Sequence, residues 1–337
     1  MDPALQLRLR AELASRRERL AHALRGDTEA EDLIRLMMTV DAALERLDTG
    51  TYGLCSVCGG AFHDHELEEN PLIQYCLCNL SQEQMRSLER DLERATRIQQ
   101  SLLPTQDLRH AGWTAHFRYR PAGPVSGDAC DLIACDGPDP VLWFLLGDVS
   151  GKGVSAALRM AHMHALLRAT IAEGVGVAEL ASRANRLLSK SDEAEYATLV
   201  VGRALPDGTV EMCNAGHVPP YHLGAGGPTA LCTGGFPLGL IPSSDYISET
   251  VRVDPGESLV LYTDGLTEAR SASGEEFGAE RLVALLRAAS TESPQELAAA
   301  CLSELRSYLA AGRPADDMTL LVIRRDDHHG RLSAAAC

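Results

Sequence analysis

Four aspartates share a sequence setting that suits metal chemistry. Each lies at the end of an apolar, strand-like run and beside glycine or another small residue. They are Asp128, Asp148, Asp264 and Asp316. A single aspartate in such a place commonly caps a helix or begins a turn. Four repeats of the pattern favour a shared site, because carboxylate oxygens are the ligands that Mg²⁺ and Mn²⁺ prefer.

Two divalent cations would suit a set of four carboxylates. Held about 4 Å apart, two cations lower the pKa of a shared water and stabilise an in-line phosphoryl displacement. The segment GDVSGKGVS contains one of the aspartates and also looks like a nucleotide-binding loop. It fails the Walker A pattern, because only three residues separate Gly147 from Gly151 and Gly153 follows Lys152. Nucleotide hydrolysis is therefore not expected.

An ordered set of motifs accompanies these aspartates between about residues 95 and 325. The motifs are ATRIQQSLLP, SGDACD, GDVSGKGVSAALRM, NAGHVPP, FPLGL, LYTDGLTEA and DDMTLLV. In this order they resemble the PPM-type metal-dependent Ser/Thr protein phosphatases, in the SpoIIE/RsbU-like bacterial branch. The resemblance implies an α+β fold in which an αββα sandwich carries the metal site at one edge, between its two sheets.

The resemblance also implies roles for individual residues. Asp148 would bridge two Mn²⁺ or Mg²⁺ ions with help from the Val149 carbonyl, and Asp264 and Asp316 would be further ligands. Asp128 would be an outer ligand or hold metal-bound water. The implied reaction is hydrolysis of phosphoserine or phosphothreonine on a partner protein, and the implied substrate is a phosphorylated anti-sigma-factor antagonist.

Three neighbouring polar residues match the family less decisively. Asp131 and Asp317 occupy acidic or polar family positions with weaker roles. His217 has the chemistry of a general acid, but in this motif we expect it to hydrogen-bond a loop. No arginine directly precedes Asp128 to bind phosphate, as one does in the eukaryotic relatives.

A cysteine cluster lies upstream of these motifs. Cys55 and Cys58 form a CxxC pair, and Cys76 and Cys78 follow after 17 residues. A CxxC on a tight turn presents two thiolates to one Zn²⁺, and a second pair completes a tetrahedral site. With no export signal, this spacing favours metal or redox chemistry over structural disulfides. The prediction is a zinc ribbon.

Residues 1–80 resemble the DksA/TraR family, in which two helices lead into such a finger. In that family the second pair is usually CxxC, which would place the last ligand at Asn79, whereas this chain has CxC. The fourth ligand is therefore Cys78, His63 or His65, unless the finger is metal-free or forms a disulfide. The resemblance implies that the acidic tip of the hairpin binds RNA polymerase. We favour a different function for residues 1–80, which is regulation of the phosphatase.

Helical periodicity and capping signals set the elements that position these sites. Apolar spacing predicts helices over 4–25 and 29–48 and a third from Ser81 to Leu103, where Pro104 stops it. From Trp113 onward, strand-like runs alternate with helix pairs at 153–173 and 177–190 and at 278–289 and 294–311. The expected domains are 1–80, a linker helix over 81–104, the phosphatase over 105–325 and a tail over 326–337.

Composition narrows the function classes further. The chain has 337 residues and a net charge of −16, which disfavours nucleic acid as a partner. No window of 18 apolar residues occurs, so we expect a cytoplasmic protein that does not bind membranes. The apolar stripe of the linker helix allows a homodimer.

The leading hypothesis is a metal-dependent phosphatase regulated by a zinc finger. The alternative is a DksA-like RNA polymerase-binding regulator that carries a phosphatase domain.

Overall fold

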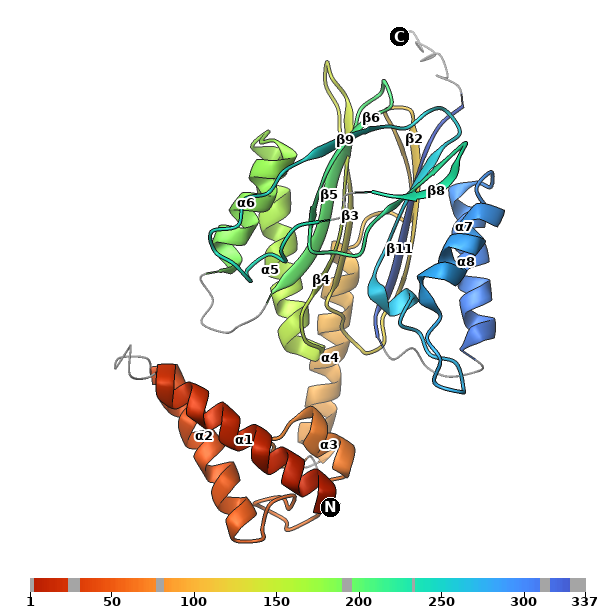
Figure 1. Ribbon diagram of the computed structural model, residues 1–337. Helices are drawn as coiled ribbons and strands as arrows, with labels where there is room; N and C mark the ends of the chain where they lie inside the picture. Colours follow the sequence, from red (N-terminus) through yellow and green to blue (C-terminus); the bar gives the residue numbers. More distant parts are fainter. Residues whose placement is uncertain are drawn as a thin grey trace. The chain divides into compact units, whose positions relative to one another are not determined.

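The computed structural model describes residues 3–23, 31–76, 82–189, 196–231, 234–309 and 316–327. The chain divides into two compact units, Met1–Glu89 and Arg90–Cys337 (Figure 1). Each unit has its own hydrophobic core. Helix α4 (Gln82–Leu102) contains the boundary between them.

The first unit is built on an antiparallel helical hairpin, as its periodicity predicts. Helices α1 (Pro3–Ala23) and α2 (Glu31–Asp48) are joined by ion pairs of Arg10 with Asp48 and of Arg17 with Asp41. The residue number rises on one helix as it falls on the other, which defines the antiparallel arrangement. The leucines at positions 5, 9, 13 and 20 of α1 are buried in the core of this unit.

The second unit contains two antiparallel sheets. The six-stranded sheet has the order β1-β2-β11-β10-β7-β8, and the five-stranded sheet has the order β3-β4-β5-β6-β9. The strands of the first are β1 (Asp107–His110), β2 (Trp113–Arg120), β11 (Met318–Arg325), β10 (Ser258–Tyr262), β7 (Tyr221–Gly224) and β8 (Gly227–Ala230). Those of the second are β3 (Asp128–Cys135), β4 (Val141–Val149), β5 (Ala197–Ala204), β6 (Thr209–Ala215) and β9 (Glu249–Arg252).

Two helix pairs cover the outer faces of the sheets (Figure 1). Helices α5 (Gly153–Ala172) and α6 (Val177–Leu188) share a core with the five-stranded sheet. Helices α7 (Gly278–Ala288) and α8 (Pro294–Tyr308) share one with the six-stranded sheet. A third core, which includes Trp113 and Phe144, lies between the sheets. The predicted αββα sandwich is therefore confirmed.

Some short elements escape the periodicity of the sequence. Strand β1 pairs with β2 through a tight turn in which Ala111 and Gly112 both have positive φ, 53° and 79°. Four-residue strands such as β1 and β8 are too short for an alternating pattern to be recognised. In the first unit, the six-residue helix α3 (Asp64–Glu69) was also not expected. The cysteine segment forms one isolated bridge, Leu54 with Ala61, among the residues described there.

Among the helices of the described residues, none combines the length and the apolarity that crossing a bilayer requires.

Candidate functional site

The two sheets deliver the four candidate aspartates to one region of the second unit. Asp128 begins β3 and lies directly opposite Asp148 of β4. Asp264 follows β10 and begins a short 3₁₀ helix (Asp264–Leu266), while Asp316 lies two residues before β11, the neighbour of β10. Each sheet thus supplies two carboxylates, although 188 positions separate the first from the last in the sequence.

Hydrogen bonds across the sheets fix Asp128. The hydroxyls of Thr263 and Thr319 both donate to its Oδ2, at 3.0 and 2.5 Å. The residue is only 2% exposed. Its burial, followed by the charge of Asp148, raises the pKa of Asp128, and the two threonine hydrogen bonds oppose that rise. One carboxylate oxygen is therefore already engaged by protein, which suits the outer role that the resemblance implies.

Mutual repulsion between carboxylates characterises the rest of the cluster. Burial, followed by the charges of Asp264 and Asp316, raises the pKa of Asp148 to about 7. Burial, followed by the charge of Asp316, also raises the pKa of Asp264. Carboxylates crowded in this way are stabilised by a divalent cation, and their oxygens are the donors that Mn²⁺ and Mg²⁺ prefer. The donor set fits the predicted metal pair.

Backbone close to these aspartates leaves no room for side chains. A Cβ on Gly127 would lie 2.8 Å from the Val149 carbonyl oxygen, and one on Gly265 would lie 2.1 Å from the Asp317 carbonyl oxygen. Asp317 itself is held by backbone, because its two carboxylate oxygens accept from the N–H groups of Ala122 and Gly127. These glycines keep Val149 and Asp317 close to the cluster.

The carboxylates are not packed as tightly as the ligands of a single ion. In the described part of the chain, no three of the four aspartates have oxygens that all lie within 4.8 Å of one another. Repulsion between the carboxylates keeps their oxygens apart. Two cations need ligands over a wider region than one cation does, so this wider spacing is compatible with a pair of ions.

Asp131 and His217 make hydrogen bonds and ion pairs that hold parts of the fold together. Asp131 accepts two hydrogen bonds from Arg168 of α5, at 2.5 and 2.8 Å, and lies 2.9 Å from His164, so it ties α5 to β3. His217 donates from Nε2 to the Tyr262 carbonyl and accepts at Nδ1 from Thr198. Burial lowers the pKa of His217 to about 4, so the ring is neutral near pH 7 and is poorly suited to act as an acid.

Three positioning residues were not singled out from the sequence. Thr263 and Thr319 hold Asp128, as described above. Gln99 of α4 is 7% exposed, donates to the Ser126 carbonyl at 2.6 Å and accepts from the Ser126 N–H at 2.9 Å. The motifs TDG and DDMT contain both threonines, and ATRIQQSLLP contains the glutamine. Their partners become evident only when distant strands and α4 are brought together.

The cysteine cluster is the second group of candidate ligands. The sulfurs of Cys55, Cys58 and Cys76 all lie within 4.8 Å of one another, with 3.3 Å between those of Cys58 and Cys76. Backbone N–H groups, first that of Cys58, lower the pKa of Cys55 to about 7, which favours its thiolate. Cys76 takes part in a disulfide. Cys78 lies outside the described residues, and neither His63 nor His65 belongs to the three-residue set.

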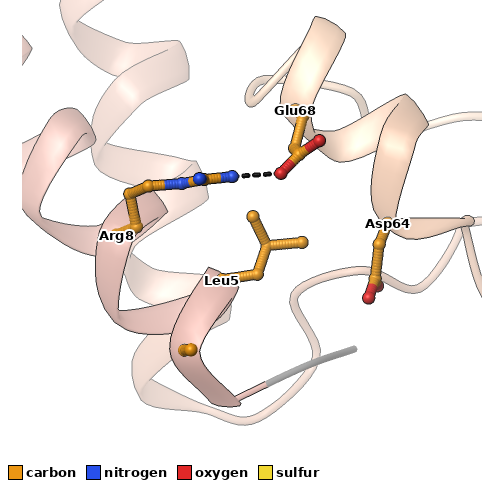
Figure 2. A pocket seen from close by; sticks show the side chains of 5 residues that line it. Leu5, Arg8, Asp64 and Glu68 are labelled. Carbon is orange, nitrogen blue, oxygen red and sulfur yellow. Dashed lines mark hydrogen bonds and ion pairs between the residues drawn. The ribbon is translucent and has the colours of Figure 1, made fainter. Parts of the chain in front are cut away.

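A shallow cavity of about 340 Å³ lies between α1 and α3 in the first unit. It is lined by Ala4, Leu5, Arg8, Asp64 and Glu68. Figure 2 shows that Arg8 and Glu68 form an ion pair at its side. Two of its charges are therefore already paired, and its lining contains no metal-ligating cluster.

Comparison with known proteins assigns the second unit to a family. The family described as Stage II sporulation protein E (SpoIIE) matches residues 138–326, and the chain belongs to this family. The match includes Asp148, Asp264 and Asp316, whereas Asp128 lies before it.

Two relatives and two solved structures support this assignment. Protein IcfG of Synechocystis sp. is 31% identical over 70% of this chain, which spans 42% of that protein. Phosphoserine phosphatase RsbU of Bacillus subtilis is 23% identical over 78% of this chain and 80% of its own. The RsbU and RsbW domains of a Mycobacterium tuberculosis protein match with a TM-score of 0.56 and 27% identity, over 67% of this chain and 62% of theirs. The SiaA-PP2C domain of Pseudomonas aeruginosa shares the fold, with a TM-score of 0.60, 23% identity and coverage of 72% and 98%.

Proposed function

We propose that the protein is a metal-dependent protein-serine/threonine phosphatase. The observation that carries the proposal is the convergence of Asp128, Asp148, Asp264 and Asp316 from two sheets, in a domain of the SpoIIE family. The chain is similar to the phosphoserine phosphatase RsbU over most of the length of both proteins, and this similarity supports phosphate ester hydrolysis as the reaction.

The residues of the cluster have distinct parts in this proposal. Asp148, Asp264, Asp316 and the Val149 carbonyl would hold two Mn²⁺ or Mg²⁺ ions. When bound, such ions lower the pKa of water and neutralise phosphoryl charge. Asp128 is fixed by two threonine hydroxyls. It would be an outer ligand or hold a water of the site. Water adds to phosphorus as the bond from phosphorus to the seryl oxygen breaks, which releases inorganic phosphate and the serine hydroxyl.

The substrate would be a protein of a partner-switching pathway. By the resemblance to the RsbU-like branch, we propose a phosphorylated anti-sigma-factor antagonist. The alternative function, RNA polymerase binding, is not favoured, because two relatives, RsbU and RsbP of Bacillus subtilis, are phosphoserine phosphatases.

The first unit would regulate the phosphatase. In this proposal residues 1–80 bind one Zn²⁺ through Cys55, Cys58, Cys76 and Cys78, and the clustering of three sulfurs supports it. The disulfide at Cys76 adds a redox alternative, because an oxidised sulfur is lost to zinc. The helix over 81–104 would connect finger and phosphatase. Met85 and Leu88 on its apolar stripe are exposed, as a homodimer through this helix would require.

The substrate class is tested with one protein phosphorylated separately on serine, threonine or tyrosine. In Mn²⁺, we expect the full chain to release phosphate from the serine and threonine forms. Asp264→Ala should abolish that release without unfolding the protein. Release from none of the three forms, or equal release by Asp264→Ala, would defeat the proposal.

A further inference from the structure

Lysine is rare in this chain. Of its 31 basic side chains, 29 are arginine and two, Lys152 and Lys190, are lysine. Lys152 is also the one lysine among the described residues, and it lies between Val149 and helix α5. Arginine supplies nearly every positive charge in this chain. A lysine at this position therefore suggests that a compact ammonium group is needed there, instead of the planar guanidinium group of arginine.

The position of Lys152 brings this ammonium to the acidic cluster. Its Nζ lies 3.0 Å from Asp316 Oδ2. Its charge also acts on Asp148 and Asp264, because it opposes the upward shift of the pKa of each. One cation therefore interacts with three of the four candidate metal ligands.

The backbone on both sides of Lys152 borders open space. Gly151 and Gly153 flank it with φ of +96° and +75°, in the left-handed region that favours glycine, and nothing lies within 4 Å of a Cβ built on either. The Lys152 side chain is 69% exposed, compared with 44% for Asp316. The ammonium thus lies on the solvent side of the cluster, from which a phosphoprotein must approach.

We propose that Lys152 binds the phosphoryl group of the substrate. The inference rests on the proposed phosphatase function and adds the phosphate-binding residue that the sequence lacks before Asp128, where Gly127 stands. Divalent cations on the aspartates would satisfy Asp316 and repel the ammonium. The phosphoryl group of a bound substrate would then offer the ammonium an anionic partner, which a lysine binds as a point charge with three donors.

The test uses the full chain loaded with Mn²⁺ and inorganic phosphate as the probe. Lys152→Met should weaken phosphate binding, measured by calorimetry, by about 10- to 100-fold, because a charge-assisted hydrogen bond is lost. Lys152→Arg should restore part of the affinity. The KM for a phosphoseryl protein should rise in parallel in Lys152→Met.

Two controls separate this role from a simple counter-charge. Arg183→Gln on α6 makes the same change in net charge at a side chain paired with Glu173 and Glu179, and it should leave phosphate affinity unchanged. Mn²⁺ affinity of Lys152→Met should equal or exceed that of the unaltered protein, because a competing cation is gone.

Unchanged phosphate affinity in Lys152→Met, with tighter Mn²⁺ binding, would show that Lys152 only neutralises Asp316 and would overturn the inference. Loss of Mn²⁺ binding would also overturn it. Failure of the unaltered protein to release phosphate from any phosphoprotein is a different result and defeats the phosphatase proposal itself.

Discussion

The two groups of candidate metal ligands in this protein are assembled in opposite ways. The sulfurs of Cys55, Cys58 and Cys76 come from 22 consecutive residues and lie within 4.8 Å of one another. The carboxylates of Asp128, Asp148, Asp264 and Asp316 come from two sheets and meet only when the whole domain has folded. A local turn builds the first group, and long-range strand pairing builds the second.

This difference predicts how each group depends on its metal. A short segment with few strands gains much of its order from the ion itself, as small zinc modules do. The αββα sandwich has three hydrophobic cores to hold its aspartates in place without any ion. Removing metal should therefore disturb the cysteine segment of the first unit, and in the second unit it should disturb only the chemistry.

The largest effect is expected from removing one carboxylate of the sandwich. Asp148→Asn takes away a charge that burial, followed by the neighbouring aspartates, already disfavours, since these raise the pKa of Asp148 to about 7. We expect phosphatase activity to fall about 100- to 1000-fold or more, with no drop in the melting temperature of the metal-free protein. Asp136→Asn, which alters a side chain that is 96% exposed, is the control and should behave as the unaltered chain. An unfolded Asp148→Asn protein would contradict the idea that the sandwich stands without metal.

The cysteine group should show the opposite dependence. Metal analysis of the purified, reduced protein should find about one zinc per chain, and Cys58→Ser should reduce it to nearly none. Cys135→Ser, at the end of β3, should retain the zinc. Chelation should loosen the cysteine segment, seen as faster amide hydrogen exchange there, and leave the sandwich folded. Equal zinc content in the unaltered chain, Cys58→Ser and Cys135→Ser would contradict the prediction of a zinc finger.

The sandwich itself carries a pH-sensitive group that the metal chemistry does not use. His217 is neutral in the folded protein, with its pKa lowered to about 4 by burial, compared with 6.5 in the ordinary state. Because the unfolded chain takes up the proton first, stability should fall as pH drops from 6.5 towards 4. At pH 5 the loss is about 2 kcal/mol, measured by urea unfolding against pH 7. His217→Gln should flatten this difference, and an unchanged pH dependence in that variant would refute the assignment.

The smallest effect concerns the connection from α4 to the aspartates. Gln99→Ala removes both hydrogen bonds to Ser126, two residues before Asp128, and should cost about 1–3 kcal/mol of stability. Activity should fall severalfold, because the start of β3 is held less firmly. Gln100→Ala, at the exposed neighbouring position, is the matched control. If both variants behave alike, α4 does not position the site.

The sequence predicted most elements of the sandwich, but only some of the residues that form the site. Apolar periodicity and capping signals placed the long strands and helices. The repeated carboxylates at strand ends predicted the grouping of the aspartates, and their role as metal ligands remains a prediction. The roles of Thr263, Thr319 and Gln99 could not be predicted, because each depends on a contact between segments far apart in the chain. The zinc ribbon remains a prediction, since Cys78 lies outside the described residues. Short elements such as β1 and α3 carry too few residues for a periodic signal.

Phosphate release from a phosphoseryl protein tests the account most directly. The full chain is first freed of metal with EDTA, and Mn²⁺ is then added back. We predict no release in EDTA, full release on addition of Mn²⁺, and none for Asp148→Asn under either condition. Release in EDTA, or equal release by Asp148→Asn in Mn²⁺, would contradict the claim that these carboxylates form the active centre of a metal-dependent phosphatase.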